Sequence, residues 1–252
     1  MQKLPTKKHL LLFDIDGTLT KSRLTIEPPM IECLNKARKY FDLGIVGGSD
    51  RVKQIEQLGD TTYEFNWAFS ENGTLSFRER EEIHKNSIAH FLGEDKLKSL
   101  INFCLKLVID TDVPIKRGTF LEYRNGLINL SPIGRNCTQE ERLAFVEFDK
   151  QHHILNKMAD MIRDKFDSEG VYVSVGGQIS IDIFPKGWDK TYCLQFIENV
   201  YEDIHFFGDK CYKGGNDYEI YEHKRTVGHW VKNGPGDTIA EVEKLIKEYG
   251  YE

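Results

Sequence analysis

Two aspartates separated by one residue follow an apolar segment near the N-terminus. Residues 9–13 read HLLLF, which predicts a buried strand that we expect to continue through residue 16 and to carry Asp14 and Asp16 at its end. Because alternate residues of a strand point to the same side, both carboxylates can face one pocket, although a turn beginning at Ile15 would alter this. Neighbouring carboxylates at the carboxyl end of a buried strand suit a divalent cation and a phosphoryl group. A strand followed by an Asx-type turn is the alternative interpretation.

The complete segment DIDGT is more informative than the aspartate pair, and it resembles the first motif of the haloacid dehalogenase-like (HAD) phosphotransferases. In that family the first aspartate is the nucleophile and forms an aspartyl-phosphate. The second aspartate, where present, is the general acid/base. The resemblance therefore implies that Asp14 is the nucleophile and that Asp16 is the acid/base.

A glycine-rich turn, Gly47-Gly48-Ser49-Asp50, follows the second predicted strand. Its glycines allow the backbone to approach a phosphate, Ser49 offers a hydroxyl, and the next helix presents free N–H groups. The same residues are compatible with an ordinary helix N-cap. Beside DIDGT, the turn resembles the second HAD motif, in which the serine binds the transferring phosphoryl group. Lys53 lies one helical turn later and can face the same site.

Charged residues late in the chain supply the other parts expected of a phosphoryl-transfer site. Lys190 stands at a predicted helix start, where it opposes the helix dipole and is therefore an odd choice for stability alone. The HAD resemblance implies that it offsets charge on the nucleophile and the phosphate. Asp209, Asn216 and Asp217 lie in two Gly-rich loops. With Asp14 and the backbone at Asp16, they can form the oxygen site that Mg²⁺ prefers, with Asp209 as a direct ligand.

The middle of the chain carries a local group of arginines. Arg124, Arg135 and Arg142 fall within a stretch that is otherwise close to neutral, and guanidinium forks bind phosphate in a bidentate manner. Ser180 and Asp182 alternate along a predicted strand and therefore share one face. A hydroxyl and a carboxylate beside arginines suit a sugar next to its phosphate.

The order of the predicted elements indicates an α/β core interrupted by an insert. Alternating strands and helices in residues 1–85 and 187–252 predict a parallel sheet with right-handed crossovers, whereas residues 86–186 predict an antiparallel sheet with helices on one face. Together with the resemblance, this predicts a HAD-like Rossmannoid core and an α+β cap. Core strands are expected at 9–16, 43–46, 67–70, 204–208 and 225–231, and core helices at 28–40, 50–58, 216–221 and 236–249. Cap strands are expected at 119–124, 127–131, 171–175 and 178–184. A cap helix is expected at 94–109, and a long helical region at 138–167.

The segments RNGLINLSPIGR, GGQISIDIFPKGWDK and FGDKCYKGGNDYEIY narrow the resemblance. They look like the eukaryotic-type phosphomannomutases of the HAD superfamily, and the similarity extends over nearly the whole chain. This resemblance implies that the hexose phosphate is bound by six residues. They are Arg23, Arg124, Arg135, Arg142, Ser180 and Asp182.

The same resemblance implies a reaction. Mannose 6-phosphate and mannose 1-phosphate would be interconverted through an aspartyl-phosphate and a hexose 1,6-bisphosphate activator (mannose or glucose), with Mg²⁺, to supply GDP-mannose synthesis. A homodimer formed through the cap is also expected. Two alternatives stay open from the residues: a HAD-type sugar phosphatase or hexose bisphosphatase, which shares the core motifs, and a non-catalytic phosphosugar-binding protein.

One position departs from the family pattern. A second cation is often bound after the NDxEI segment by a backbone carbonyl, an acid and a threonine. Tyr221 and Thr226 match, but His223 stands where the acid is expected. A neutral imidazole is a poor ligand for a hard cation, so a second cation site at Tyr221 and Thr226 is in doubt, and catalysis is not expected to depend on it.

Composition excludes several other classes of protein. A net charge of -6 argues against broad nucleic-acid binding, and no apolar stretch approaches the ~20 residues of a membrane span. The basic N-terminus leads directly into the first strand and does not resemble a signal peptide. The 5 cysteines lack CxxC spacing, which fits reduced thiols in a cytoplasmic protein.

Overall fold

The computed structural model describes residues 7–176 and 178–251, which form two compact units. Unit 1 combines the chain up to Lys85 with the chain from Gly187 onward, and unit 2 is Asn86–Lys186. Residues 1–6 of the predicted core, Gly177 of the GGQISIDIF segment and Glu252 lie outside the described residues. Within the described ranges, none of the helices is both long enough and apolar enough to cross a membrane.

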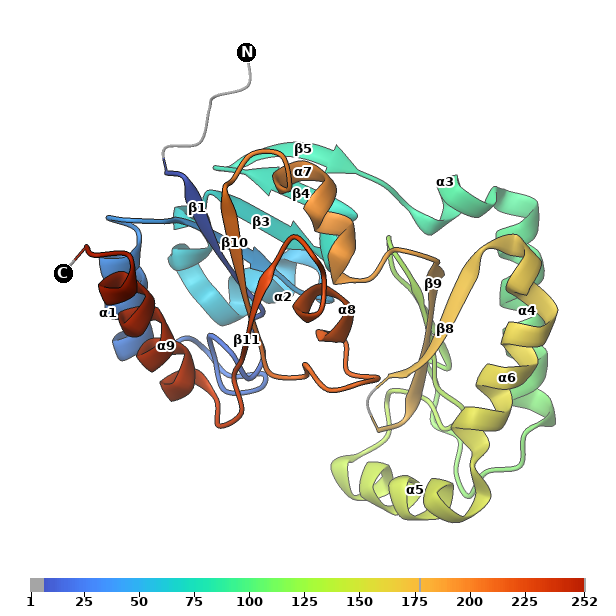
Figure 1. Ribbon diagram of the computed structural model, residues 1–252. Helices are drawn as coiled ribbons and strands as arrows, with labels where there is room; N and C mark the ends of the chain where they lie inside the picture. The colour runs from blue at the N-terminus through green and yellow to red at the C-terminus, as the bar shows by residue number, and fades with distance from the viewer. Residues whose placement is uncertain (1–6, 177, 252) are drawn as a thin grey trace. The chain divides into compact units, whose positions relative to one another are not determined.

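Unit 1 is built on a 7-stranded sheet in the order β11-β10-β1-β2-β3-β4-β5 (Figure 1). The five strands from β11 to β3 pair in parallel, and β4 and β5 extend the edge in antiparallel fashion. The strands are β1 (His9–Phe13), β2 (Asp42–Val46), β3 (Trp67–Ser70), β4 (Leu75–Arg78), β5 (Glu81–Lys85), β10 (Asp203–Gly208) and β11 (Val227–Trp230).

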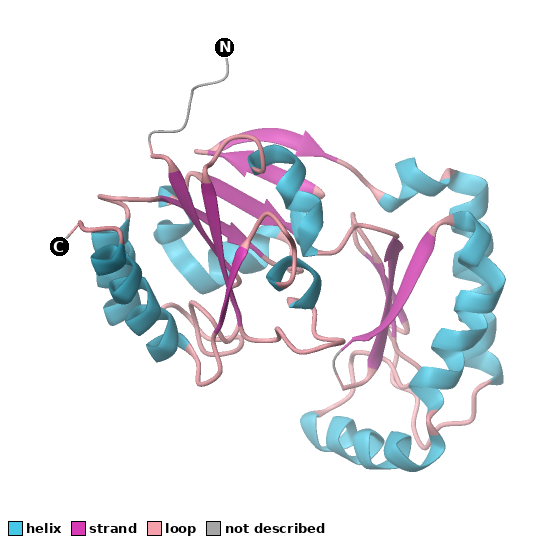
Figure 2. Cartoon of the chain, in the orientation of Figure 1, coloured by secondary structure: helices cyan, strands magenta, loops and turns pink. Residues whose placement is uncertain are grey.

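Helices cover both faces of this sheet (Figure 2). Because a parallel strand is buried on both sides, β1 is a continuous apolar run rather than an alternating one. Leu11 and Phe13 belong to one hydrophobic cluster with α1 and α9, while Leu10 and Leu12 belong to another with α7 and α8. The helical segments of unit 1 are α1 (Pro28–Ala37), α2 (Arg51–Leu58), α7 (Leu194–Ile197), α8 (Tyr218–Tyr221), α9 (Pro235–Glu248) and the 3-10 turns η1 (Gly59–Glu64), η2 (Glu71–Gly73) and η4 (Lys190–Cys193).

Unit 2 contains a 4-stranded antiparallel sheet in the order β6-β7-β9-β8. Apolar residues from alternate positions of these strands pack against the helices in one cluster, which leaves a polar row on the other face. The elements are β6 (Leu121–Tyr123), β7 (Ile128–Leu130), β8 (Val171–Gly176), β9 (Ser180–Pro185), α3 (Ile88–Leu92), α4 (Glu94–Asp110), α5 (Gln139–His152), α6 (Ile154–Phe166) and the 3-10 turn η3 (Asp167–Glu169).

The structure differs from the predicted secondary structure in several places. The strand expected at 9–16 ends at Phe13, because the N–H groups of residues 18, 19 and 20 all turn back to the carbonyl of Ile15. The long helical region expected at 138–167 is divided into two helices at His153, which has φ 54°. The β4–β5 hairpin was not predicted, because β5 is mostly exposed and its sequence, EEIHK, lacks a clear apolar pattern.

Candidate active site

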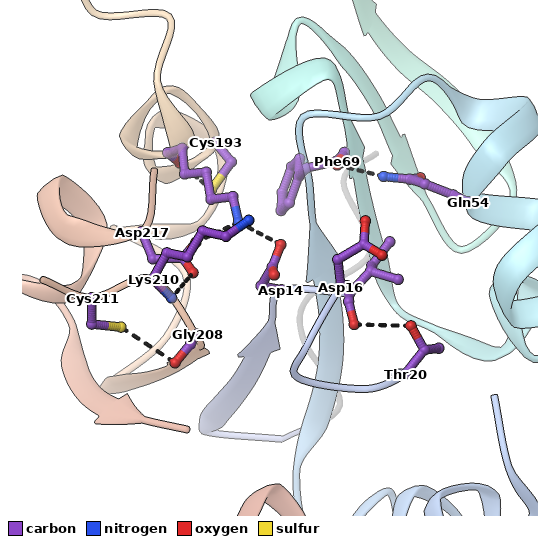
Figure 3. Close-up of polar contacts among 12 residues, drawn as sticks. Asp14, Asp16, Thr20, Gln54, Phe69, Cys193, Gly208, Lys210, Cys211 and Asp217 are labelled. Carbon is purple, nitrogen blue, oxygen red and sulfur yellow. Dashed lines mark hydrogen bonds and ion pairs between the residues drawn. The ribbon is translucent and has the colours of Figure 1, made fainter. Parts of the chain in front are cut away.

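Asp14 lies at the carboxyl end of the central strand of unit 1. Its N–H donates to the carbonyl of Phe207 over 2.9 Å, so the backbone continues the pairing with β10 by one residue before the turn starts. Asp14, labelled in Figure 3, is 5% exposed, and its carboxylate accepts a hydrogen bond from Lys190. Burial raises the pKa of Asp14, the Lys190 ammonium opposes this rise, and Asp217 and Asp209 add to it, so that the pKa lies well above its usual range.

Lys190 is the cation at the centre of this group. It is 1% exposed, and its ammonium donates to Asp14 and to Asp217, which lies at the start of α8. Asp189 caps η4 by accepting from the N–H of Thr191 over 2.8 Å, which fixes the backbone from which Lys190 projects. Burial lowers the pKa of Lys190, but the two carboxylates raise it more, so the ammonium stays charged.

Three carboxylates gather around the Lys190 ammonium. Asp14, Asp209 and Asp217 each place an oxygen within 4.8 Å of the others, and burial is the main reason that the pKa of Asp209 is raised. With all groups ionised, three carboxylates face one ammonium, so two negative charges remain uncompensated. Asp209 Oδ1 is buried and has no hydrogen-bond partner among the described residues. A hard divalent cation fits these donors, because it accepts carboxylate oxygens and offsets their charge.

Glycines allow these carboxylates to approach one another. Gly17 has φ +78°, and a Cβ added there would lie 2.5 Å from Asp209 Oδ2. A Cβ added at Gly208 would lie 2.7 Å from Asp217 Cγ. Real Cβ atoms do not approach other atoms so closely, so both positions need glycine for the cluster to form.

The carboxylate of Asp16 does not belong to this cluster. Its Oδ1 accepts from the backbone N–H of Arg23 over 2.6 Å and from Gln57 Nε2 over 2.9 Å. The turn that begins at Ile15 therefore directs the two carboxylates to different surroundings, so the expectation that both face one pocket was wrong. Arg23 itself has φ 63° and an exposed side chain. Sequence reasoning missed Gln57, whose partner is 41 residues away in the chain and leaves no local signal.

The turn after β2 lies beside Asp14. A Cβ added at Gly47 would be 3.9 Å from Asp14 Oδ1, and Asp50 caps α2 by accepting from the N–H of Lys53 over 2.9 Å. The N–H groups of Glu71 and Asn72 donate to the carbonyls of Ser49 and Gly47. This turn is therefore positioned by η2.

Sequence reasoning also missed Asn72. Its N–H binds the turn after β2, and its Nδ2 donates over 3.0 Å to the carbonyl of Trp188, two residues before Lys190. Asn72 has φ 62°, a conformation in which Asn is more common than most residues. The sequence Glu71-Asn72-Gly73 after β3 could have indicated a turn with positive φ, because Asn and Gly favour that conformation.

The remaining predicted metal residues have other surroundings. Asn216 is exposed, whereas the adjacent Asp217 is fully buried. The Thr226 hydroxyl hydrogen-bonds to the carbonyls of Ile220 and His223. In the turn where a second cation site was in doubt, this hydroxyl therefore already has partners within the protein. Tyr221 belongs to α8, on the approach to this turn.

In unit 2, the predicted binding residue Asp182 lies in a polar row of the sheet, and Arg124 and Arg135 contact this row. The row consists of Glu122, Asn129, Asp182 and Ser174, which are directly opposite one another on β6, β7, β9 and β8. Glu122 Oε2 accepts from Arg124 Nη2 over 2.6 Å and lies 3.1 Å from Arg135 Nε.

Arg142 and Ser180, the remaining predicted binding residues of unit 2, lie near this row. Burial lowers the pKa of Arg135, and Arg124 and Arg142 lower it further through repulsion, so the three guanidinium groups share one region. Ser180 is 7% exposed and lies two residues before Asp182 on β9, on the same face. The structure therefore groups a hydroxyl, a carboxylate and three arginines within unit 2.

Comparison with known proteins assigns the family. Residues 30–248 match the family model of eukaryotic phosphomannomutase. A phosphomannomutase from Schizosaccharomyces pombe is 53% identical over 244 residues, which cover 95% of each chain. One from Dendrobium officinale is 54% identical over 244 residues, which cover 96% of each chain.

Solved structures resemble the fold at low sequence identity. A haloacid dehalogenase-like hydrolase from Bacteroides thetaiotaomicron has a TM-score of 0.61 and 14% identity, over 95% of this chain and 100% of that chain. An IMP-nucleotidase from Plasmodium falciparum has a TM-score of 0.64 and 15% identity, over 97% and 69% of the two chains. The predicted HAD-like α/β fold is confirmed, and the chain belongs to the eukaryotic phosphomannomutase family.

Proposed function

We propose that this protein is a phosphomannomutase that interconverts mannose 6-phosphate and mannose 1-phosphate through an aspartyl-phosphate on Asp14. Family membership supports the reaction class, and the observation that carries the site assignment is the buried group of Asp14, Lys190, Asp209 and Asp217. A hexose 1,6-bisphosphate would phosphorylate Asp14 and start the cycle.

The residues of unit 1 divide the work of phosphoryl transfer. Asp14 attacks the phosphorus, and Lys190 with Ser49 offsets charge on the phosphoryl oxygens. Asp16 protonates the leaving sugar oxygen and then removes the proton from the incoming hydroxyl. The N–H of Arg23 and the amide of Gln57 both donate to Asp16 Oδ1. These two hydrogen bonds hold the Asp16 carboxylate in one orientation, which supports its role as acid and base.

The three carboxylates would hold Mg²⁺. Asp209 is the best candidate for a direct ligand because of its unpartnered Oδ1, with Asp14 and Asp217 beside it and the Asp16 backbone and Asn216 in support. Bound Mg²⁺ would supply positive charge that keeps Asp14 ionised and polarises the phosphoryl group. A second cation at Tyr221 and Thr226 is not needed for this chemistry.

The residues of unit 2 would bind the part of the substrate that is not reacting. Arg124, Arg135 and Arg142 suit the distal phosphate, and Ser180 and Asp182 suit sugar hydroxyls. In unit 1, Arg23 is a further candidate for binding the hexose phosphate. The sugar monophosphate must bind in two orientations so that either O1 or O6 reaches Asp14. Exclusion of water during the cycle would keep the aspartyl-phosphate from hydrolysis.

We further propose a cytoplasmic homodimer, formed through unit 2, that supplies GDP-mannose synthesis. All five cysteines are free, which agrees with a reducing compartment. Light scattering of the purified protein tests the dimer, since a monomeric mass at micromolar concentration would contradict it.

Phosphorus NMR tests the function directly. The protein is incubated with mannose 1-phosphate, Mg²⁺ and a catalytic amount of hexose 1,6-bisphosphate. Growth of the mannose 6-phosphate signal without inorganic phosphate is the expected result. Release of inorganic phosphate as the main product would instead identify a phosphatase, and absence of both signals would identify a non-catalytic binding protein.

A further inference from the structure

Asn129 is a buried polar residue in a strand that is otherwise apolar. The residue is 3% exposed, and its neighbours on β7, Ile128 and Leu130, are fully buried in the hydrophobic cluster of unit 2. Asparagine is depleted in strands, and burying an amide is unfavourable unless all of its polar atoms find partners. A packing role alone therefore does not explain an amide at this position.

Both ends of the Asn129 amide make short hydrogen bonds to residues of opposite charge. Oδ1 accepts from Arg135 over 2.6 Å, and Nδ2 donates to Asp182 Oδ1 over 2.6 Å. A guanidinium only donates and a carboxylate only accepts, so a single orientation of the amide satisfies both partners. Asn129 is thus a rigid link between the two groups that we assign to different parts of the ligand.

The attraction between Arg135 and Asp182 explains why an uncharged residue is needed between them. Arg135 and Asp182 attract each other, since each charge favours the ionised form of the other and so offsets part of the effect of burial on its pKa. Glu122, Arg124 and Arg142 are the other charged groups that act on this pair. Without an intervening amide, Arg135 and Asp182 would be drawn into a direct ion pair, and neither would be available to a ligand.

We propose that Asn129 is a positioning residue that keeps Arg135 and Asp182 apart, so that the guanidinium binds phosphate while the carboxylate binds a sugar hydroxyl of the same molecule. The proposal rests on the proposed function, because it takes a hexose phosphate as the ligand. It makes recognition of the sugar and of the phosphate depend on one uncharged side chain.

Two substitutions separate the two halves of the link. Asn129→Leu removes both hydrogen bonds. Asn129→Asp keeps an acceptor for Arg135 but places a second carboxylate against Asp182, where the pair can bond only when it holds one proton. Calorimetric titration measures the Kd of each variant for mannose 1-phosphate and for inorganic phosphate, at about pH 8 and about pH 5.5. The ratio of the two Kd values gives the preference for the sugar ligand. No bisphosphate is added, so that binding is measured without turnover.

At the higher pH, we expect the preference for mannose 1-phosphate over inorganic phosphate to fall about tenfold in both variants. This is the size of effect expected for the loss of one buried polar contact. At the lower pH, Asn129→Asp should recover most of the wild-type preference measured at that pH, whereas Asn129→Leu should not. A purely structural role for Asn129 would weaken both ligands together and would give no recovery. Asn102→Asp, which adds the same charge at an exposed position of α4, is the matched control and should keep the preference.

The outcomes distinguish this proposal from the proposed function. If the wild-type protein does not prefer mannose 1-phosphate over inorganic phosphate, the proposed function fails and the inference with it. If the wild type has this preference and both variants retain it, only the role of Asn129 is refuted. An Asn129→Asp protein that fails to fold even at the lower pH would also refute it, because the shared proton should restore the link.

Discussion

Replacing Gly17 by alanine tests whether the close approach of this glycine to Asp209 sets the geometry of the carboxylate cluster. The new Cβ would lie 2.5 Å from Asp209 Oδ2 and 2.8 Å from Asp209 Cγ, so the aspartate must move away from its present position. The residue would also have to keep φ near +78°. The two effects can be separated, because the first involves Asp209 and the second is local to the backbone.

The magnitude of the effect follows from these two terms. A non-glycine residue in the left-handed region costs roughly 1–2 kcal/mol, and inserting a methyl group into an occupied site costs about 1–3 kcal/mol more. We therefore expect Gly17→Ala to lower the free energy of unfolding by about 2–5 kcal/mol. Because the displaced carboxylate is the candidate metal ligand, we also expect a higher Mg²⁺ concentration at half-maximal mutase activity.

Gly250→Ala is the matched control. Gly250 has φ +70° and no atom within 4 Å of an added Cβ, so it carries the backbone cost without the contact. Urea denaturation should show a loss of only about 1–2 kcal/mol for this variant, with an unchanged Mg²⁺ requirement. If Gly17→Ala matched Gly250→Ala in both measurements, the argument that Gly17 positions Asp209 would be wrong.

Three further predictions concern other parts of the molecule. Asp14→Asn should abolish phosphoenzyme formation, and retention of radiolabel from a labelled hexose bisphosphate by the variant would rule out Asp14 as nucleophile. Arg142→Ala should raise the KM for mannose 1-phosphate with little change in melting temperature, and unaltered kinetics at every substrate concentration would count against a phosphate site there. Burial, aided by the nearby His229, lowers the pKa of His205 to about 4 from its ordinary value of 6.5, so the unfolded chain binds more protons than the folded one between these pH values. Stability should therefore fall by roughly 2 kcal/mol from pH 7 to pH 5 on account of this group. The same urea titrations on His205→Gln should show a shallower pH dependence, and identical slopes for the two proteins would refute the assignment.

Local patterns in the sequence predicted much of unit 1. A parallel strand buried on both faces has a continuous apolar run, and β1 has this pattern together with two aspartates at its end. The β4–β5 hairpin had no such pattern, because β5 is mostly exposed and charged, and it was missed. The break at His153 was missed because residues on both sides of it have helical character, and only the backbone conformation of one residue separates α5 from α6.

By itself, the sequence determined which acidic, basic and glycine residues follow each core strand. The order of these motifs was enough to predict the HAD-like fold and the family. Only the tertiary structure decided how these side chains pair. Lys190 contacts Asp14 across 176 residues of chain and Asp217 across 27, and Asn129 contacts Asp182 across 53. The turn at Ile15 likewise directs the Asp16 carboxylate to Arg23 and Gln57 rather than to the carboxylate cluster. Such contacts have no sequence period, because they depend on where strands and turns meet in space, and the pKa of a buried group depends on all of them at once.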